Sequence, residues 1–156
     1  MANIAFYTDG GNYEHPQSEE ECVDLASLLL ESGPIAIDVE TISLDERTPI
    51  GVSIAPDSNC AFYYPLFPDI SPYIPWKILR DPNRIKILHN CMFDLDVLDD
   101  ISPHNIFDTC LVASWVGLPW ALDDIAPGLG MYDKMSISEI LPKGKTMLDI
   151  PEELVA

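Results

Sequence analysis

The central part of the chain is a series of short apolar runs separated by polar turns. Residues 35–41 (IAIDVET) begin apolar and end in acids, which indicates a buried strand with a polar end. Residues 50–56 and 60–66 predict two more strands around a polar turn at 57–59. A fourth strand is expected at 84–90 (RIKILHN). Several neighbouring strands of this length predict a sheet.

Other segments combine helical spacing with capping residues. A helix is expected over 18–31, where Ser18 is the N-cap and Glu21 its capping-box partner. Prolines concentrate at 65–82, which indicates an irregular connection. Further helices are expected at 92–99, at 107–117 entered at Asp108, at 122–128, and from Asp149 onward. The order of elements predicts an α/β fold, with a mixed sheet flanked by helices.

Composition adds a constraint on the partners of this domain. The 156 residues are expected to form one domain, 1–156, with 1–17 as an N-terminal extension or strand. With 26 acidic and 8 basic residues the net charge is −18, which argues against binding nucleic acid through a basic surface. For most of the basic residues, two roles stay equally open: a loop or solubilising role, and a contact with the backbone of a nucleic acid. These residues form two groups: Lys77, Arg80, Arg84 and Lys86, then Lys134, Lys143 and Lys145.

Membrane and secreted classes find no support in the sequence. No apolar run reaches the roughly 20 residues of a membrane span, and the first residues lack a signal-peptide pattern. The four cysteines form no CxxC pair, which disfavours a zinc site or a disulfide framework. We therefore expect a cytoplasmic protein of a bacterium or a phage-infected cell, with buried thiols at Cys22, Cys60, Cys91 and Cys110.

A pair of acids at the end of the first central strand is the first candidate for chemistry. Asp38 and Glu40 are two residues apart, so alternation along a strand places both carboxylates on one face. Two like charges on an apolar strand favour a cation between them, and Mg²⁺ or Mn²⁺ prefers such oxygen ligands. A strand end that simply runs into a solvated loop is the structural alternative.

A second acidic segment strengthens the metal hypothesis. In 87–100 (ILHNCMFDLDVLDD) a strand ends near His89, and Asp94 lies at the start of the next helix. If the two strands are neighbours, Asp94 would complete a cage with Asp38 and Glu40. His89 is expected to pack or to form a hydrogen bond rather than to bind metal. Three further acids of this helix are expected to face solvent: Asp96, Asp99 and Asp100.

Several blocks in order carry a resemblance to a known module. They are IAIDVETISL, GVSIAPDSNCAFYYPL, HNCMFDLDVL, FDTCLVASWVG, LDDIAPGLG and PKGK. The sequence resembles the 3′–5′ proofreading exonuclease domain of family A DNA polymerases, of the bacterial repair type, over about residues 20–156. These domains are DEDD exonucleases with a ribonuclease-H-like fold. The ribonuclease D-like and helicase-associated exonucleases share the first two motifs, and the GVSIA…FYYPL and KGK blocks favour the polymerase branch.

The resemblance implies roles for individual residues. Asp38, Glu40 and Asp94 match the catalytic carboxylates that bind two divalent ions, Mg²⁺ or Mn²⁺. Asp108 matches a position that anchors a helix. The residues implied to contact the 3′ end of single-stranded or frayed DNA are Thr41, Leu44, Asn90, Phe93 and Ile137, the last replacing a bulkier aromatic residue.

The third motif of the family, a Tyr or His followed four residues later by Asp, is not found in the sequence. The helix expected to carry it only begins at PEELVA. The fold is therefore expected to be truncated at its C-terminus, and the site to be incomplete without a further helix or a second chain that carries it with a polymerase domain. Weak activity of a fragment is a second hypothesis. A catalytically inactive module that binds a replication protein is a third.

Overall fold

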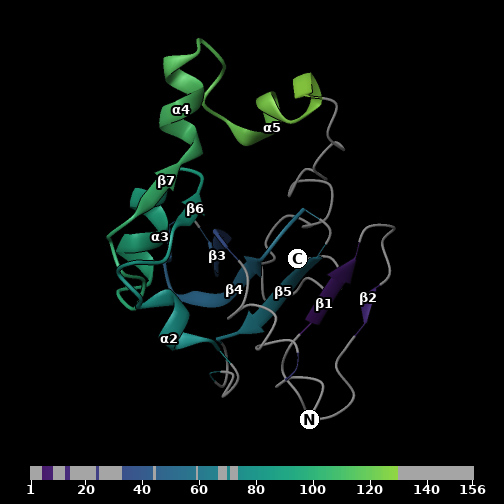
Figure 1. The fold of residues 1–156 in the computed structure, drawn as a ribbon, viewed down its shortest axis with the longest axis vertical. Coiled ribbons are helices and arrows are strands. Elements are labelled where there is room, and N and C mark those ends of the chain that lie inside the picture. Colours follow the sequence, from purple (N-terminus) through teal and green to yellow (C-terminus); the bar gives the residue numbers. More distant parts are fainter. Residues whose placement is uncertain are drawn as a thin grey trace.

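The computed structural model describes residues 5–8, 13–14, 24, 33–43, 45–58, 60–66, 70 and 74–129. In this part of the chain the strands form one mixed sheet in the order β2-β1-β5-β4-β3-β6-β7 (Figure 1). The strands are β1 (Ala5–Thr8), β2 (Tyr13–Glu14), β3 (Ile35–Thr41), β4 (Pro49–Ala55), β5 (Cys60–Pro65), β6 (Lys86–Leu88) and β7 (Ile106–Asp108). The helices are α2 (Trp76–Leu79), α3 (Cys91–Val97), α4 (Thr109–Trp115) and α5 (Leu122–Ile125), with a 3-10 turn at Pro127–Leu129.

The sheet combines both kinds of pairing. Strands β3, β4 and β5 are antiparallel neighbours, and β1 and β2 extend this side in the same manner. On the other side β3 pairs in parallel with β6, and β6 pairs in parallel with β7. The predicted mixed α/β sheet is confirmed, and β3 has the predicted bounds.

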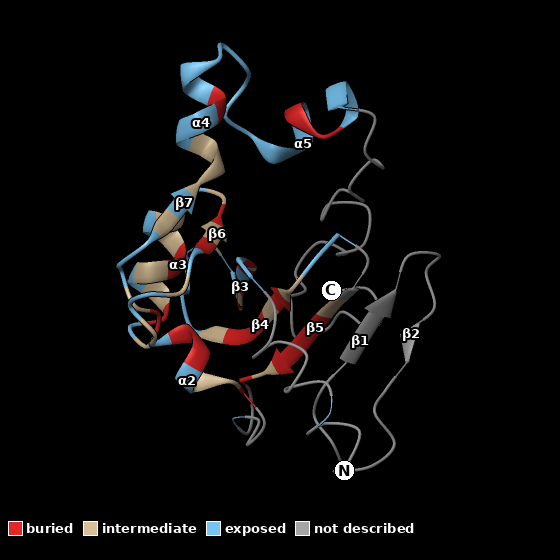
Figure 2. Cartoon of the chain, viewed as in Figure 1, coloured by how far each residue is buried: buried red, intermediate tan, exposed pale blue. Residues whose placement is uncertain are grey.

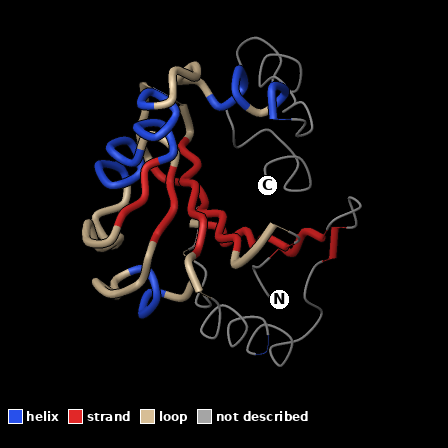
Figure 3. The backbone as a smooth tube through the Cα atoms, turned by 45° about the horizontal axis from the view of Figure 1, so that its top comes forward, coloured by secondary structure: helices blue, strands red, loops and turns tan. Residues whose placement is uncertain are grey.

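The hydrophobic core lies on one face of this sheet. Along β3, Ile35, Ile37 and Val39 are buried, while the residues between them are more exposed. The buried residues of β4 and β5 join them, and α2 and the end of α3 cover this face, to one side of the strands in Figures 1 and 3. Each fully buried side chain of this kind stabilises the fold by roughly 1.5–3 kcal/mol. The alternation therefore orients β3, and it leaves the intervening positions for polar side chains.

Several elements differ from the sequence-based expectation. The strand expected over 84–90 is limited to Lys86–Leu88, and the helix expected over 122–128 is Leu122–Ile125 followed by a 3-10 turn. The proline-rich stretch expected to be irregular contains α2, in which Ile78 and Leu79 are buried. The helix expected over 107–117 is shorter, because Ile106–Asp108 pairs with β6 as strand β7 before α4 begins. A three-residue strand is too short to show a period of two, so its pattern merges with that of the helix.

The predicted helices at the two ends fall largely outside the described residues. Of 18–31, only Asp24 is described, and it is helical. The segment from Asp149 onward lies wholly outside the described part. Among the described residues, no helix is long and apolar enough to cross a membrane. Helices α4 and α5 are mainly exposed (Figure 2), and Leu111 and Trp115 on α4 have exposed fractions of 60% and 89%.

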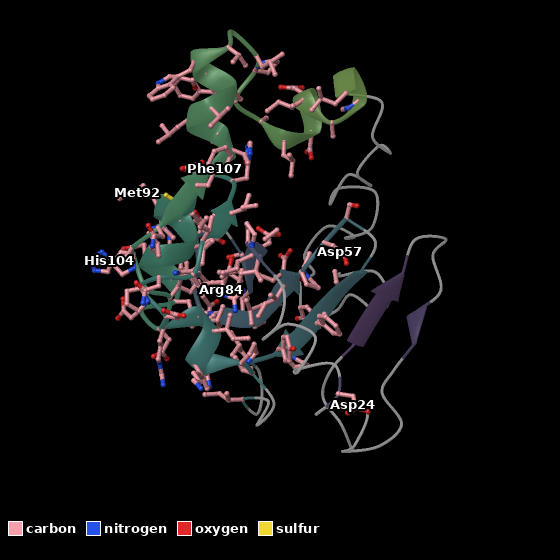
Figure 4. The ribbon with its side chains drawn as sticks, in the orientation of Figure 1. Asp24, Asp57, Arg84, Met92, His104 and Phe107 are labelled. Carbon is pink, nitrogen blue, oxygen red and sulfur yellow. The ribbon has the colours of Figure 1, made fainter. Side chains whose placement is uncertain are left out.

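A buried lysine fastens the start of β6. Lys86 has no exposed surface, and its Nζ donates to the backbone carbonyls of Asp81 at 2.9 Å, Arg84 at 3.0 Å and His104 at 3.1 Å (Figure 4 labels the last two residues). Burial lowers the pKa of Lys86, against the opposing effect of Asp81. Two of the three carbonyls come from the loop between α2 and β6 and the third from the loop after α3, so this ammonium group holds both loops against the strand.

Replacing Lys86 by Met is expected to lower the free energy of unfolding by about 1–3 kcal/mol, because three carbonyls lose their buried donor. Met preserves most of the side-chain volume, so the loss reports the hydrogen bonds rather than a cavity. Chemical denaturation measures the change. Lys77→Met, an exposed lysine on α2, is the control and should change stability little. Equal stability of Lys86→Met and the wild type would contradict the role assigned to the ammonium group.

Candidate active site

The two acids of β3 lie together on the face opposite the core. Asp38 is exposed and Glu40 is half-buried, and both alternate with buried neighbours as the sequence predicts. In the ladder with β4, Asp38 lies opposite Ser53 and Glu40 lies opposite Gly51. Residues directly opposite in a sheet share a face, so small side chains flank both carboxylates. The residues opposite the two acids are therefore both small.

Gly51 has a packing reason as well. A Cβ atom at this position would overlap the ring of Tyr63, a buried residue of β5. Tyr63 is two residues before Pro65, which pairs with Gly51, so its ring lies on the acid-bearing face. The absence of a side chain at Gly51 thus lets an aromatic ring cover the sheet next to Glu40.

Asp94 reaches the same region through the backbone of β3. Its Oδ1 accepts a hydrogen bond from the backbone N–H of Val39 at 3.0 Å. The N–H of Ile35 donates to Ile85 on the β6 side, and with a period of two the N–H of Val39 points the same way. Because β6 already ends at Leu88, that N–H has no strand partner there, and the Asp94 carboxylate takes its place.

The surroundings of Asp94 disfavour its charge. It is only 2% exposed, and burial, followed by the negative charge of Asp38, raises the pKa of Asp94 to about 7. The hydrogen bond from Val39 acts in the opposite direction without cancelling these effects. Neither ion pair found in the described part of the chain includes Asp94. The pair of Asp38 and Asp94 therefore concentrates negative charge where a cation would offset it.

This donor set suits a divalent metal ion in part. Carboxylate oxygens on one strand face, with another carboxylate at the adjoining edge, are the ligands that Mg²⁺ and Mn²⁺ prefer. Within the described residues, however, no three His, Cys, Asp or Glu side chains converge into a group that could hold a metal ion. The structure thus brings Asp94 to the strand of Asp38 and Glu40, and their joint action on metal remains a prediction.

Asp108 fixes the geometry of the helix that carries Asp94. Its carboxylate accepts from the backbone N–H groups of Asn90 at 3.0 Å, Cys91 at 3.1 Å and Cys110 at 2.9 Å. Burial acts to raise the pKa of Asp108, but hydrogen bonds from Cys91, Asn90 and Cys110 outweigh burial and lower the pKa. The predicted helix-anchoring role is confirmed, because Asp108 is the N-cap of α4 and also holds the start of α3.

Two neighbours of Asp108 gain defined roles from it. Asn90, the N-cap of α3, has a φ of 65°, a left-handed conformation that Asn tolerates better than most residues. Burial, with the hydrogen bond to Asp108 next, raises the pKa of the Cys91 thiol to about 11. A thiol that stays protonated is a poor nucleophile. The sequence-based expectation of buried thiols is not met at Cys91 and Cys110, which are both half-buried.

His89 links β6 to the segment that follows α4. Its Nδ1 lies 2.9 Å from the Thr109 hydroxyl oxygen, and its Nε2 lies 2.7 Å from the Trp120 carbonyl oxygen. Since a carbonyl only accepts, Nε2 donates to Trp120. Both ring nitrogens are therefore engaged by protein groups, as the hydrogen-bonding role predicted for this histidine requires.

The residues expected to contact a nucleic acid strand are placed unequally. Phe93 and Asn90 lie at the start of α3, beside Asp94. Thr41 is 6% exposed, and its hydroxyl donates to the Ser43 carbonyl at 3.0 Å, so it stabilises the loop after β3. Leu44 and Ile137 lie outside the described residues.

One basic residue near the site was missed by the sequence reasoning. Arg47, which belongs to neither predicted basic group, donates from Nη1 to Asp96 Oδ2 at 2.6 Å, and its Cζ lies 5.5 Å from the centroid of the Phe93 ring. Its position follows from the fold of the β3–β4 loop, which no local pattern revealed. In the first predicted basic group, by contrast, Arg80 pairs with Asp100 and Arg84 donates to Gly33 O at 2.6 Å.

The fold places the chain in a class of proteins. The mixed sheet flanked by helices is that of a ribonuclease-H-like fold. A family model described as 3′–5′ exonuclease matches residues 13–144. The chain belongs to this 3′–5′ exonuclease family.

Individual relatives cover parts of the chain. Ribonuclease D of Shewanella sp. (strain ANA-3) is 31% identical over 85 residues, which are 53% of this chain and 20% of the relative. The crystal structure of Escherichia coli RNase D, an exoribonuclease, aligns with a TM-score of 0.61 at 22% identity, over 82% of this chain and 36% of that chain. The chain thus spans a minor part of each.

A third relative has been solved with ligands. The structure of Brucella melitensis NrnC with bound Mg²⁺ aligns with a TM-score of 0.56 at 24% identity, over 72% of this chain and 62% of that chain. The structure of the same protein bound to pGG also aligns with a TM-score of 0.56 at 24% identity, over 74% of this chain and 63% of that chain. At these identities the structural alignments support the fold of the present chain.

Proposed function

We propose that this domain removes nucleotides from the 3′ end of a single strand by metal-dependent hydrolysis, with Asp38, Glu40 and Asp94 as its catalytic carboxylates. The observation that carries the proposal is the hydrogen bond from Val39 N to Asp94, which joins the helix acid to the strand of the other two. Membership of the 3′–5′ exonuclease family supplies the reaction class. A divalent ion held by these carboxylates would activate a water and relieve charge on the leaving oxygen.

Each protein group then has a limited task. Asp38 and Glu40 present oxygen ligands from one exposed strand face, and Asp94 adds its carboxylate from the sheet edge. Asp108 keeps Asp94 in place by fixing the start of α3. Phe93 offers an aromatic face next to Asp94, and stacking on such a face binds bases with little regard to sequence. Bound metal ions, more than basic side chains, would offset the negative charge of the substrate phosphates. This is consistent with the net charge of −18.

DNA or RNA is the finer part of the proposal. The resemblance of the sequence blocks favours DNA proofreading beside a family A polymerase. Relatives named Ribonuclease D, and the exoribonuclease structure, favour RNA as the competing substrate. A strand assay with matched DNA and RNA of one sequence decides between them, because the same carboxylates would serve both.

A further proposal concerns the fourth carboxylate that the family uses. It would be supplied by a helix beyond the described residues or by a second chain that also carries a polymerase domain. Addition of that partner to the domain should then raise the cleavage rate without changing its dependence on Asp38. A partner that raises a rate independent of Asp38 would argue for a second nuclease instead.

A non-catalytic module is the alternative function. The absence of a converging metal-ligand group among the described residues favours it, and its acidic surface would bind a basic replication protein. Such binding should persist in EDTA and should weaken with added salt. Loss of all partner binding in EDTA would remove the support for this alternative.

The test of the proposed function is a strand-shortening assay. A 5′-labelled single strand, as DNA or as RNA, is incubated with the protein and Mg²⁺ or Mn²⁺, and the products are resolved on a gel. We expect a ladder that grows shorter from the 3′ end and disappears in EDTA. Blocking the 3′ end serves as the control for direction. Internal cuts, or an unshortened strand in Mn²⁺, would count against the proposal.

A further inference from the structure

The loop between β3 and β4 is closed on itself by hydrogen bonds. Ile42 N donates to Thr48 O at 3.1 Å, and Ser43 N donates to Glu46 O at 3.2 Å. The Ser43 hydroxyl oxygen also accepts from Glu46 N at 2.9 Å. These contacts set the direction of the next residue, Arg47, which extends from this loop to α3.

Arg47 makes two different contacts on α3. Its guanidinium lies over the ring of Phe93, with Cζ 5.5 Å from the ring centroid, and donates to the carboxylate of Asp96 at 2.6 Å. Phe93 and Asp96 are three residues apart, so they share a face of the helix. Phe93 and Asp94 are consecutive on α3, and Arg47 lies in the loop that follows β3, so the guanidinium links the two elements that carry the proposed catalytic acids.

The ion pair of Arg47 is suited to exchange. The Arg47 and Asp96 side chains are 54% and 62% exposed, and exposed ion pairs contribute little to stability. A guanidinium has five donors in a planar fork that fits phosphate oxygens as well as carboxylate oxygens. A phosphate next to the metal site could therefore replace Asp96 at little cost.

The other described basic residues are placed differently. Arg80 pairs with Asp100, Arg84 donates to a backbone carbonyl, and Lys86 is buried. Lys77 is on α2, the helix of the core face. Among the described basic residues, Arg47 is thus the one that links the loop after β3, the strand of the two acids, to α3, the helix of Asp94.

We infer that Arg47 is a positioning residue for the substrate strand: while stacked on Phe93, its guanidinium leaves Asp96 and binds a backbone phosphate. This inference rests on the proposed exonuclease function and adds a protein-borne positive charge to it. When no strand is bound, the carboxylate of Asp96 pairs with the guanidinium and so competes with the phosphate.

The test uses two substitutions with opposite expected effects. Binding of a 5′-labelled single strand is measured by fluorescence anisotropy with Ca²⁺, which takes similar oxygen ligands, and a gel checks that the strand stays intact. Arg47→Ala should weaken binding about tenfold, the value of a hydrogen bond between charged groups. Asp96→Asn should strengthen binding about two- to threefold, because it removes the competitor.

The salt dependence gives a second readout. Loss of one phosphate contact should reduce the slope of log K against log salt by about 0.7 for a single strand. Arg47→Ala should show this reduction, and Asp96→Asn should not. A structural contact that only stabilised the loop would leave the slope unchanged.

The chain offers a matched control in Arg80. Its Cζ lies 5.1 Å from the centroid of the Trp76 ring, and it pairs with Asp100 at 2.5 Å, with side chains 56% and 44% exposed. Arg80→Ala thus removes the same kind of stacked ion pair away from the site, and should leave strand binding unchanged. Thermal melts of both alanine variants check that each is folded.

Several outcomes would overturn the inference. They are equal effects of Arg47→Ala and Arg80→Ala, weaker binding in both Arg47→Ala and Asp96→Asn, or no strand binding by the wild type. Its failure can be told from that of the proposed function. Binding that depends on Arg47 without any cleavage would refute only the exonuclease activity, and cleavage that ignores Arg47 would refute only the present inference.

Discussion

Asp38→Asn is expected to reduce metal-dependent shortening of a 3′ end by about 100-fold or more, the scale on which loss of one electrostatic group slows an enzyme. Asn keeps the size of the side chain and removes the charge that would bind the metal. Because Asp38 is exposed on β3, the substitution should leave the fold intact. The rate is measured on a 5′-labelled strand with Mn²⁺, and folding by thermal denaturation.

The control for charge alone is Asp57→Asn. Asp57 is also exposed and lies in the turn between β4 and β5, away from the acid pair in sequence. Its rate should match the wild type within about twofold, since a surface charge away from the site acts only through a screened field. If Asp38→Asn cleaved as fast as Asp57→Asn, the assignment of Asp38 to the metal site would be wrong.

Asp94→Asn is expected to make the metal-free protein more stable, with a gain that grows with pH. Burial and Asp38 raise the pKa of Asp94 to about 7, so the folded state holds this proton more tightly than the unfolded chain. The free energy of unfolding therefore falls as pH rises from about 4 to about 7, and stays lowered above. Asn avoids this loss, and its amide oxygen can still accept from Val39.

The size of the gain follows from the same linkage. We expect the free energy of unfolding to rise by about 2 kcal/mol at about pH 5.5 and by about 4 kcal/mol at about pH 8.5. Urea denaturation in EDTA at both values measures it. Asp99→Asn removes an exposed carboxylate just after α3 and controls for net charge. An equal gain at both pH values would contradict the raised pKa assigned to the buried Asp94. The more stable variant should also lose cleavage, because it lacks a ligand.

Alternation along the chain was a good guide to the acid-bearing strand. The pattern of 35–41 predicted both the bounds of β3 and the common face of Asp38 and Glu40, because alternation is a local property of a strand. The approach of Asp94 to β3 needed one further assumption, that β3 and β6 are neighbours. The parallel pairing of these strands confirms it.

Other features depend on contacts between distant segments and could not be predicted locally. Lys86 belongs to the first predicted basic group, for which a loop or solubilising role and a nucleic-acid contact are equally open, yet it is buried by loops that meet only in the folded sheet. Arg47 belongs to neither predicted basic group, and its partners Phe93 and Asp96 are more than forty residues away in sequence. A charge in a short segment reveals little about its neighbours in space, so both assignments required the structure.

The early end of β6 has a consequence for spectroscopy. The Val39 amide donates to a carboxylate rather than to a strand carbonyl. The electronic environment of the amide proton therefore changes when that carboxylate gains or loses a proton. A charged acceptor makes a shorter and stronger hydrogen bond than a neutral one. The ¹H–¹⁵N resonance of Val39 is therefore a built-in reporter within the sheet. Its chemical shift should follow the ionisation of Asp94 and the arrival of a cation, without any label attached to the protein.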